Sequence, residues 1–361
     1  MLDYLPLALV LLVTLPFSAE AMAQQAREGR PDPDHPRENL RLEDIPVHDP
    51  FVVAHEPTQT YYLYTSGRRV TPIDGVRRSG VFAYTSRDLQ TWSGPLLVFE
   101  VPDGSWATPG DGTWAPEVHE HNGKWHLFVT LHNNDEVFAK PPEVWQANTR
   151  RGSVIAVADS PEGPFELMNP ERPHTPWNFM ALDGTLYIDP NGQPWMVYAH
   201  EWVQVIDGTM EAVRLSDDLS KTVGEPIHLF KASDAPWVNA EMTPSTDQNE
   251  YVTDGCQLYR TKDNALVMLW SSWSKSGYVQ TICRSESGEI EGPWTQLEPL
   301  VWKDSGHGMM FDTFDGERLM ILHRPFSGPV RSKVFEMRDT GESFEVVRQR
   351  IDLDGDETAD E

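Results

Sequence analysis

The sequence predicts an all-β protein: a five-bladed β-propeller with antiparallel four-stranded blades around a central channel. Three observations predict this fold. Short apolar segments alternate with polar turns along most of the chain, and the 3.6-residue periodicity of long helices is absent. A pair of apolar strands recurs five times. The pairs repeat at intervals of roughly 55–70 residues, which is typical of propeller blades that cannot bury their faces alone.

The repeat is clearest in the second strand of each unit, which follows a polar turn. Asn-Gly or Asp-Gly pairs occur in three of these turns, at Asn122, Asn191 and Asp315, and such pairs favour hairpins because they tolerate positive φ. The five strands are Tyr61–Ser66, Trp125–Thr130, Trp195–His200, Leu266–Ser271 and Leu319–His323. We therefore predict blades at residues 45–100, 110–170, 178–232, 250–300 and 305–340, with a loop at 233–249.

The ends of the chain differ from the repeats. The apolar run Leu5–Phe17 followed by Ala21-Met22-Ala23 predicts a removed secretory signal at residues 1–23, and hence a secreted or periplasmic protein. No Lys or Arg precedes the run, so an uncleaved anchor and a misassigned start stay open as alternatives. Residues 24–44 are predicted to be an extended arm, 45–340 the five-bladed propeller domain and 341–361 an acidic tail.

Charge and cysteine content exclude several classes of protein. A net charge of -27 repels phosphate backbones and anionic lipid, so neutral ligands are favoured over nucleic acid, and no membrane partner is expected after signal removal. The two cysteines, Cys256 and Cys283, are predicted to be buried thiols, with a disulfide as the alternative. Neither has the His and carboxylate partners of a catalytic thiol.

Polar residues open the first strand of each predicted blade. In a propeller these innermost strands all begin at one end of the channel, so we expect the opening residues to converge although they are far apart in sequence. A single Asp beside Pro or Gly is more often a turn residue. The opening residues are Asp49, Trp114 to Glu117, Asp183, Asp254 and His307.

Four motifs, one per blade, carry a resemblance to a known family. They are His48–Phe51, Trp114–Val118, Leu182–Asp189 and Gly306–Met310. In these motifs and their order the chain resembles glycoside hydrolase family 43, over residues 44–336. The resemblance implies hydrolysis with inversion, which requires a general acid and a general base on opposite faces of the sugar.

The resemblance also assigns roles to the carboxylates. Asp49 matches the general base that activates water, and Asp183 matches the third carboxylate, which orients the acid and raises its pKa. Asp254 stands where the family usually has a Glu before Gly-Pro. Because Asp is one methylene shorter, Glu201 and Glu241 are kept as alternative acids.

His307 resembles the family's channel histidine, which implies a Ca²⁺ ion held beside it mainly through water. A histidine satisfied inside the channel is the alternative reading. No cofactor is expected to be required for the chemistry.

Sugar rings present apolar C–H faces, so aromatic platforms are expected at the site. Trp114 has the strongest motif, and Trp202 and Trp273 each lie just past a second strand. Arg324 is a candidate for contacts with sugar hydroxyls, and Glu117 is expected to face the same cavity.

The predicted function is therefore inverting removal of a terminal sugar, most simply α-L-arabinofuranose, from plant or algal polysaccharide. A β-xylosidase or β-galactosidase of the same fold is an alternative. A glycan-binding propeller that has lost catalysis is another, motivated by the missing Glu in blade four. The sequence leaves exo and endo action open.

Overall fold

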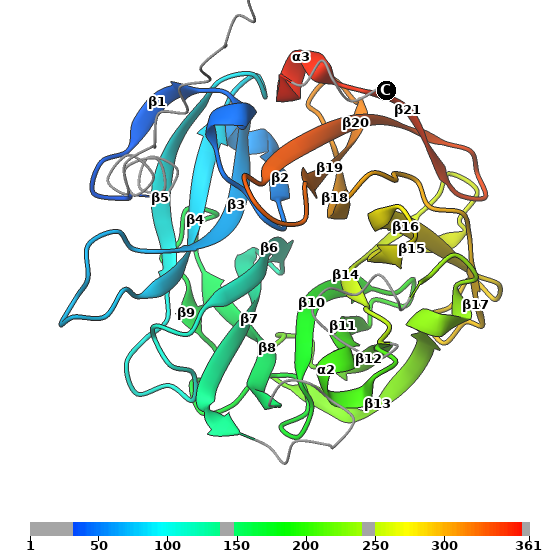
Figure 1. Ribbon diagram of the computed structural model, residues 1–361, viewed down its shortest axis with the longest axis horizontal. Coiled ribbons are helices and arrows are strands. Elements are labelled where there is room, and N and C mark those ends of the chain that lie inside the picture. The colour runs from blue at the N-terminus through cyan, green and yellow to red at the C-terminus, as the bar shows by residue number, and fades with distance from the viewer. Residues whose placement is uncertain (1–31, 138–147, 240–249, 356–361) are drawn as a thin grey trace, which may run out of the picture.

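The computed structural model describes residues 32–137, 148–239 and 250–355, and it contains the predicted five-bladed propeller (Figure 1). Blade one contains β1 (Arg37–Leu40), β2 (Phe51–His55), β3 (Thr60–Arg68), β4 (Ser79–Ser86) and β5 (Trp92–Glu100). Blade two contains β6 (Thr113–His121), β7 (Lys124–Val137), β8 (Thr149–Ala158) and β9 (Glu166–Leu167). Blade three contains β10 (Ala181–Ile188), β11 (Pro194–His200), β12 (Thr209–Leu215) and β13 (Thr222–Lys231).

The last two blades have the same antiparallel order from the channel outward. Blade four contains β14 (Asp254–Arg260), β15 (Leu266–Ser274), β16 (Gly277–Ser285) and β17 (Trp294–Gln296). Blade five contains β18 (Gly306–Asp312), β19 (Arg318–Arg324), β20 (Arg331–Asp339) and β21 (Phe344–Gln349).

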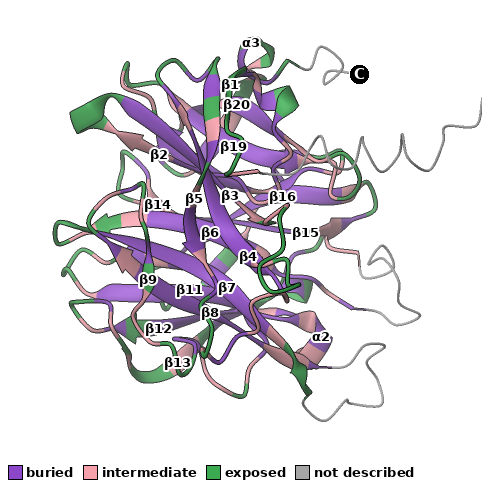
Figure 2. Cartoon of the chain, turned by 90° about the vertical axis from the view of Figure 1, so that its left-hand side faces the viewer, coloured by how far each residue is buried: buried purple, intermediate pink, exposed green. Residues whose placement is uncertain are grey.

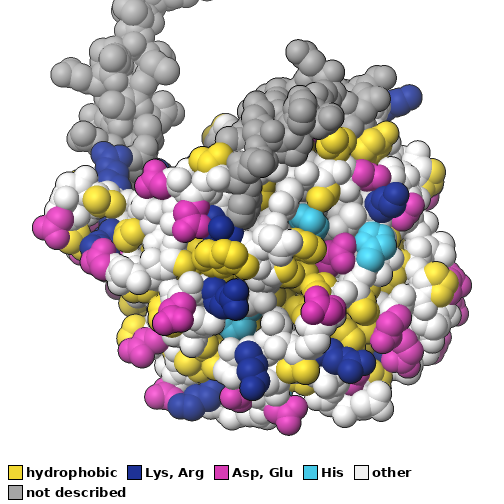
Figure 3. All heavy atoms as spheres, turned by 90° about the horizontal axis from the view of Figure 1, so that it is seen from below, with side chains coloured by type: hydrophobic (Ala, Val, Ile, Leu, Met, Phe, Trp, Pro, Cys, Tyr) yellow, Lys and Arg dark blue, Asp and Glu magenta, His cyan; other side chains and the backbone are white. Residues whose placement is uncertain are grey.

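The five innermost strands form a closed ring around the channel. Each contacts the next in the order β2, β6, β10, β14, β18 and back to β2. The strands of the blades are largely buried, whereas the connecting turns are exposed (Figure 2). Acidic and basic side chains are interspersed on the face seen in Figure 3, so the negative charge is not gathered into one patch there.

Left-handed backbone recurs near the start of every innermost strand. The φ angles are 51° at Asp49, 44° at Ala115, 57° at Asp183, 55° at Gly255 and 50° at His307. In blades two to five the pairing with the second strand shifts register at this point, which marks a β-bulge. Bulges re-aim side chains at the rims of sheets, so this repeated kink determines what faces the channel mouth.

The predicted boundary at residue 340 is wrong. Residues 344–349 form β21, the outer strand of blade five, and a short helix α3 (Ile351–Asp354) follows it. The acidic residues of this stretch hid the strand, but Phe344 is only 3% exposed. Residues 356–361 lie outside the described residues.

The predicted extended arm is also partly wrong. Within residues 24–44, β1 pairs with β5 and adds a fifth strand to blade one, and Leu42–Asp44 form a 3₁₀ helix. Residues 1–31, which include the predicted signal, lie outside the described residues. No helix in the described part of the chain is long and apolar enough to span a membrane.

Two further sequence predictions are confirmed. Cys256 and Cys283 are free and buried, and they lie on β14 and β16, which are separated by β15. The segment Asp189–Gln193 is a hairpin turn between β10 and β11, closed by hydrogen bonds between the backbones of its two end residues and to the Asp189 side chain.

Two substitutions on β21 test whether this strand belongs to the core. Phe344→Ala is expected to lower the free energy of unfolding by about 3–5 kcal/mol, because it empties a buried site between blades. Val347→Ala, on the same strand but 46% exposed, should change it by less than about 0.5 kcal/mol. Urea unfolding followed by tryptophan fluorescence measures both, and equal small effects would contradict the placement of β21.

Candidate active site

A cavity of about 550 Å³ opens at the channel end where the innermost strands begin. This volume is that of a small-molecule site. The cavity brings together most of the side chains that the sequence singled out. Its lining consists of His48, Asp49, Ser66, Trp114, Arg151, Leu182, Asp183, Glu201, Trp202, Val252, Asp254, Trp273, Tyr278, His307 and Phe326.

The repeated left-handed position explains this convergence. Asp49, Asp183 and His307 occupy the position themselves, and Trp114 and Asp254 come immediately before it. In blade four the position needs glycine, because a Cβ on Gly255 would lie 2.8 Å from the His307 ring. The sequence places one functional group at the same point of each blade, and the ring turns them toward one cavity.

Three imidazoles surround the carboxylate of Asp49. Its Oδ1 lies 2.8 Å from Nδ1 of His48, 3.1 Å from Nδ1 of His307 and 3.3 Å from Nδ1 of His323. Burial opposes ionisation, yet His307 and His48 hold the pKa of Asp49 well below its usual value. Asp49 is therefore an ionised carboxylate, as a general base must be.

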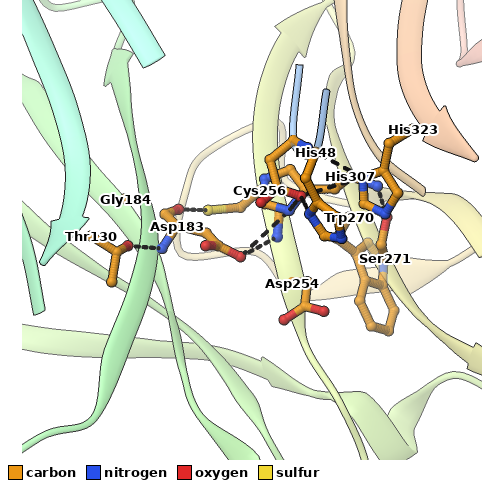
Figure 4. A network of polar contacts seen from close by, with 12 residues as sticks. His48, Thr130, Asp183, Gly184, Asp254, Cys256, Trp270, Ser271, His307 and His323 are labelled. Atoms are coloured by element: carbon orange, nitrogen blue, oxygen red, sulfur yellow. Dashed lines mark hydrogen bonds and ion pairs between the residues drawn. The ribbon is translucent and has the colours of Figure 1, made fainter. Parts of the chain in front are cut away.

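Asp183 lies on β10, which β6 separates from β2 in the ring of inner strands. Its Oδ2 accepts a hydrogen bond of 3.0 Å from the backbone N–H of Gly255, and its backbone N–H donates to Oγ1 of Thr130 at 2.9 Å (Figure 4). Burial is the main cause that raises its pKa to about 7, with Asp49 adding to the shift and His307 opposing it.

Asp254 begins β14, and Figure 4 shows it near Asp183. Its Oδ2 accepts a 2.9 Å hydrogen bond from the hydroxyl of Tyr278 on β16. Burial and the charge of Asp183 raise its pKa to about 7. A carboxyl group that keeps its proton near neutral pH can serve as a general acid.

Glu201 forms a second candidate acid on another wall. It immediately precedes the short helix α2 (Trp202–Val205), and its Oε1 accepts a 2.7 Å hydrogen bond from Arg151. Burial raises its pKa to about 7 although Arg151 opposes the shift. The Arg151 guanidinium also lies 4.9 Å from the centre of the Trp114 ring, so Arg151 contacts both the candidate acid and an aromatic residue of the cavity.

Aromatic side chains form the rest of the cavity. Trp114 is 42% exposed and packs edge-on against His132 at 4.2 Å between ring centres. Trp273 packs against Phe326 at 5.0 Å. Exposed indole and phenyl faces of this kind are suited to the C–H faces of a sugar.

Two predicted substrate contacts do not reach this cavity. Glu117 lies three residues further along β6 than Trp114, so it lines a smaller cavity below, where its Oε2 lies 3.0 Å from Nε2 of His119. Arg324 is not among the residues that line the cavity, and its Nε donates to Oγ of Ser305 at 2.6 Å. Glu241 lies outside the described residues.

The smaller cavity contains residues that could hold the predicted metal ion. His307, Glu117 and Gln257 line it, and Oε1 of Glu117 is buried without a hydrogen-bond partner. An imidazole with carboxylate and amide oxygens fits a hard cation held partly through water. Calcium in this position stays a prediction.

Four site residues were not assigned from the sequence: His48, Arg151, Tyr278 and His323. His48 stands beside Asp49 in a recognised motif, which was a usable signal. The other three lie on second or third strands, β8, β16 and β19, where no repeated motif marks the end that faces the cavity.

Comparison with known proteins identifies the family. The model of glycosyl hydrolases family 43 matches residues 45–344. The chain belongs to this family. Membership of this family, together with the relatives described below, shows that the protein is an inverting glycoside hydrolase.

Three proteins similar to this chain carry the names of arabinofuranosidases or arabinanases. An extracellular exo-α-(1→5)-L-arabinofuranosidase of Cellvibrio japonicus is 25% identical over 321 residues, covering 77% of this chain and 79% of that protein. The crystal structure of an endo-arabinase from Bacteroides thetaiotaomicron has a TM-score of 0.72 and 34% identity, covering 84% of this chain and 98% of that one. An exo-1,5-α-L-arabinanase from a bovine ruminal metagenomic library shares the fold with a TM-score of 0.59 and 20% identity, covering 84% and 97%.

The hydrogen bond from Tyr278 to Asp254 is expected to influence both the pKa and the orientation of the candidate acid. Tyr278→Phe removes a donor that stabilises the Asp254 anion, so the pKa of Asp254 should rise. The basic limb of the kcat/KM profile is expected to move to higher pH, and kcat should fall roughly tenfold as the carboxyl group loses its orientation.

Tyr62→Phe is the matched control, because the Tyr62 hydroxyl also donates to a carboxylate, Glu162, at 3.0 Å but outside the cavity. Its pH profile should match that of the unmodified enzyme. An unshifted basic limb in Tyr278→Phe would argue against Asp254 as the titrating acid.

Proposed function

We propose that this hydrolase releases terminal α-L-arabinofuranosyl residues from plant or algal polysaccharide, with Asp49 as base and Asp254 as acid. The supporting observation is the contrast between two carboxyl groups at one cavity. Asp49 is surrounded by imidazoles that hold its pKa well below the usual value, whereas partial burial and the charge of Asp183 raise the pKa of Asp254 to about 7. Such pairs separate the base from the acid.

The geometry suits a single displacement. Asp49 precedes β2 and Asp254 begins β14, and these strands are not neighbours in the ring of inner strands. Asp49 takes a proton from water as the water oxygen attacks the anomeric carbon. Asp254 gives its proton to the departing glycosidic oxygen, so the bond to the leaving group breaks as the new C–O bond forms. Asp183, next to Asp254, disfavours the Asp254 anion and thereby keeps the acid protonated.

The choice of sugar is supported by the relatives. A relative that is 25% identical to this chain is named an exo-α-(1→5)-L-arabinofuranosidase, and a similar structure at 34% identity is named an endo-arabinase. Structures of a β-xylosidase and a β-1,3-galactosidase are also similar, but at 15% and 17% identity they speak for the fold alone. Because one relative is an exo enzyme and the other an endo enzyme, action at the chain end rests on the Cellvibrio protein.

Two further proposals follow from the same comparisons. We propose that the protein is exported, since curated relatives from Cellvibrio japonicus and Bacillus subtilis are named extracellular and the sequence predicts a signal at residues 1–23. The retained acid and base chemistry favours an enzyme over a glycan-binding propeller that has lost catalysis.

Leaving-group dependence separates the roles of the carboxylates. Asp254→Asn should slow cleavage of unsubstituted arabino-oligosaccharides by about 10²–10⁴-fold. The same variant should cleave aryl arabinofuranosides much faster than it cleaves these oligosaccharides, because an acidic phenol leaves without needing a proton from the enzyme. Asp49→Asn should lose activity on both kinds of substrate to about the same extent. Glu345→Gln, on the exposed side of β21, is the control and should retain full activity.

The same assays decide the alternatives. If Glu201→Gln rather than Asp254→Asn shows selective loss with poor leaving groups, Glu201 is the acid. Proton NMR of the first-formed sugar should show the β-anomer; the α-anomer would exclude inversion. Binding of arabinan without turnover would contradict the proposal that the protein hydrolyses arabinan.

We also propose that Ca²⁺ binds in the smaller cavity beside His307, where Glu117 and Gln257 supply oxygen atoms. The ion would add positive charge beneath the base. Calcium at 100 times its Kd should stabilise the fold by about 2.7 kcal/mol, seen as a rise in Tm of EDTA-treated protein on adding Ca²⁺ but not Mg²⁺. An unchanged Tm would contradict the proposal.

A further inference from the structure

His48 has a hydrogen-bond acceptor on each side of its ring. Its Nδ1 lies 2.8 Å from Oδ1 of Asp49, and its Nε2 lies 3.1 Å from the backbone carbonyl oxygen of Phe326. A neutral imidazole donates from one nitrogen and accepts at the other. A neutral His48 would therefore face one of these oxygens with a lone pair, whichever tautomer it adopted.

Only the doubly protonated ring satisfies both contacts. We infer that His48 is a permanent imidazolium that positions the base: it donates one N–H to Asp49 and the other to the carbonyl of Phe326, and so holds Asp49 ionised and fixed relative to blade five. The inference rests on the proposed role of Asp49 as base. It makes His48 a positioning residue, since it acts through Asp49.

The surroundings of His48 support a cation there. The ring stacks on His323 with 3.9 Å between ring centres, and His323 is fully buried, with its pKa lowered to about 4 by burial and by His48. A neutral ring beside a charged one avoids a second positive charge. Burial opposes protonation of His48, but Asp49 and the Phe326 carbonyl raise its pKa to about 9, and Asp254 contributes in the same direction.

The acceptor on the far side is itself fixed. The backbone N–H of Phe326 donates to Oδ2 of Asp304 at 3.1 Å, and the Phe326 ring packs against Tyr278 at 4.8 Å. Tyr278 in turn holds Asp254. The carbonyl that orients His48 therefore belongs to the same packed unit as the residue that orients the proposed acid, which links the positions of acid and base.

A metal ion is the competing explanation for the cluster. The ligand atoms of His48, Asp49 and His323 lie within 4.8 Å of one another. A metal would need the Nδ1 lone pair of His48, so that this nitrogen would carry no proton. The protonation state of Nδ1 thus distinguishes the two.

The test is ¹H–¹⁵N NMR of the histidine rings in the full-length protein, after EDTA treatment and without substrate. Both nitrogens of His48 should carry the ¹⁵N shifts of imidazolium from pH 6 to 8, with assignment by loss of the signals in His48→Phe. A neutral His48 at pH 7, or loss of the proton on Nδ1 of His48 when Zn²⁺ or Ca²⁺ is restored, overturns the inference. Because this readout needs no turnover, it remains valid if the proposed function fails.

Kinetics of matched variants tests the positioning. His48→Phe keeps an aromatic ring over His323 but donates nothing, and its kcat is expected to fall about 100-fold. His48→Asn keeps an N–H donor toward Asp49 without charge and should recover about tenfold of that loss. His55→Asn, on β2 but outside the cavity, should be unaffected. Equal loss in both His48 variants, or no loss in either, overturns the role.

Discussion

Four carboxyl groups share one cavity in this propeller, and their mutual repulsion is the constraint that the surrounding residues must meet. Asp49 is ionised because imidazoles surround it. Near Asp183 and Asp254 the charge of His307, which lies 3.7 Å from Asp183, opposes protonation, but burial and the proximity of the two carboxyl groups outweigh it and raise both pKa values to about 7. Glu201 has a cation in Arg151, but burial outweighs it. The different surroundings of chemically similar groups give them different protonation states, which acid–base catalysis requires.

This division depends on backbone geometry as much as on charge. A residue in left-handed conformation is uncommon for anything but glycine, yet Asp49, Asp183 and His307 all adopt it at corresponding points of three blades. Such conformations persist only where surrounding structure holds them. Here that structure is the ring of inner strands, which fixes each kink between two neighbouring blades. The site is thus a property of the closed ring rather than of any single blade.

The repeat made the fold and the convergence of Asp49, Asp183 and Asp254 predictable, because one geometric rule applies to each blade. The same rule did not predict which side chains reach the cavity when this depended on a shift of a few residues along a strand. Glu117 belongs to the same motif as Trp114, but the bulge between them directs it below the site. Arg151 and Tyr278 lie on third strands, where sequence gives no sign of which end approaches the channel. The outer strand β21 was missed because it is short and rich in charge, and only its contacts with β20 define it.

Within residues 32–355 as far as the structure describes them, no strand is exchanged between the first and last blades, since β1 and β2 belong to blade one and β18 to β21 belong to blade five. The seam between these blades is held instead by contacts such as the donation from Arg41 to the carbonyl of Asp352 and the pairing of Pro46 with Arg331. These partners lie about as far apart in sequence as the domain allows. During synthesis the channel must therefore stay open until the last blade leaves the ribosome, and Asp49 meets His307 and His323 only then. The catalytic base is among the first parts of the domain to be made and among the last to acquire its final environment.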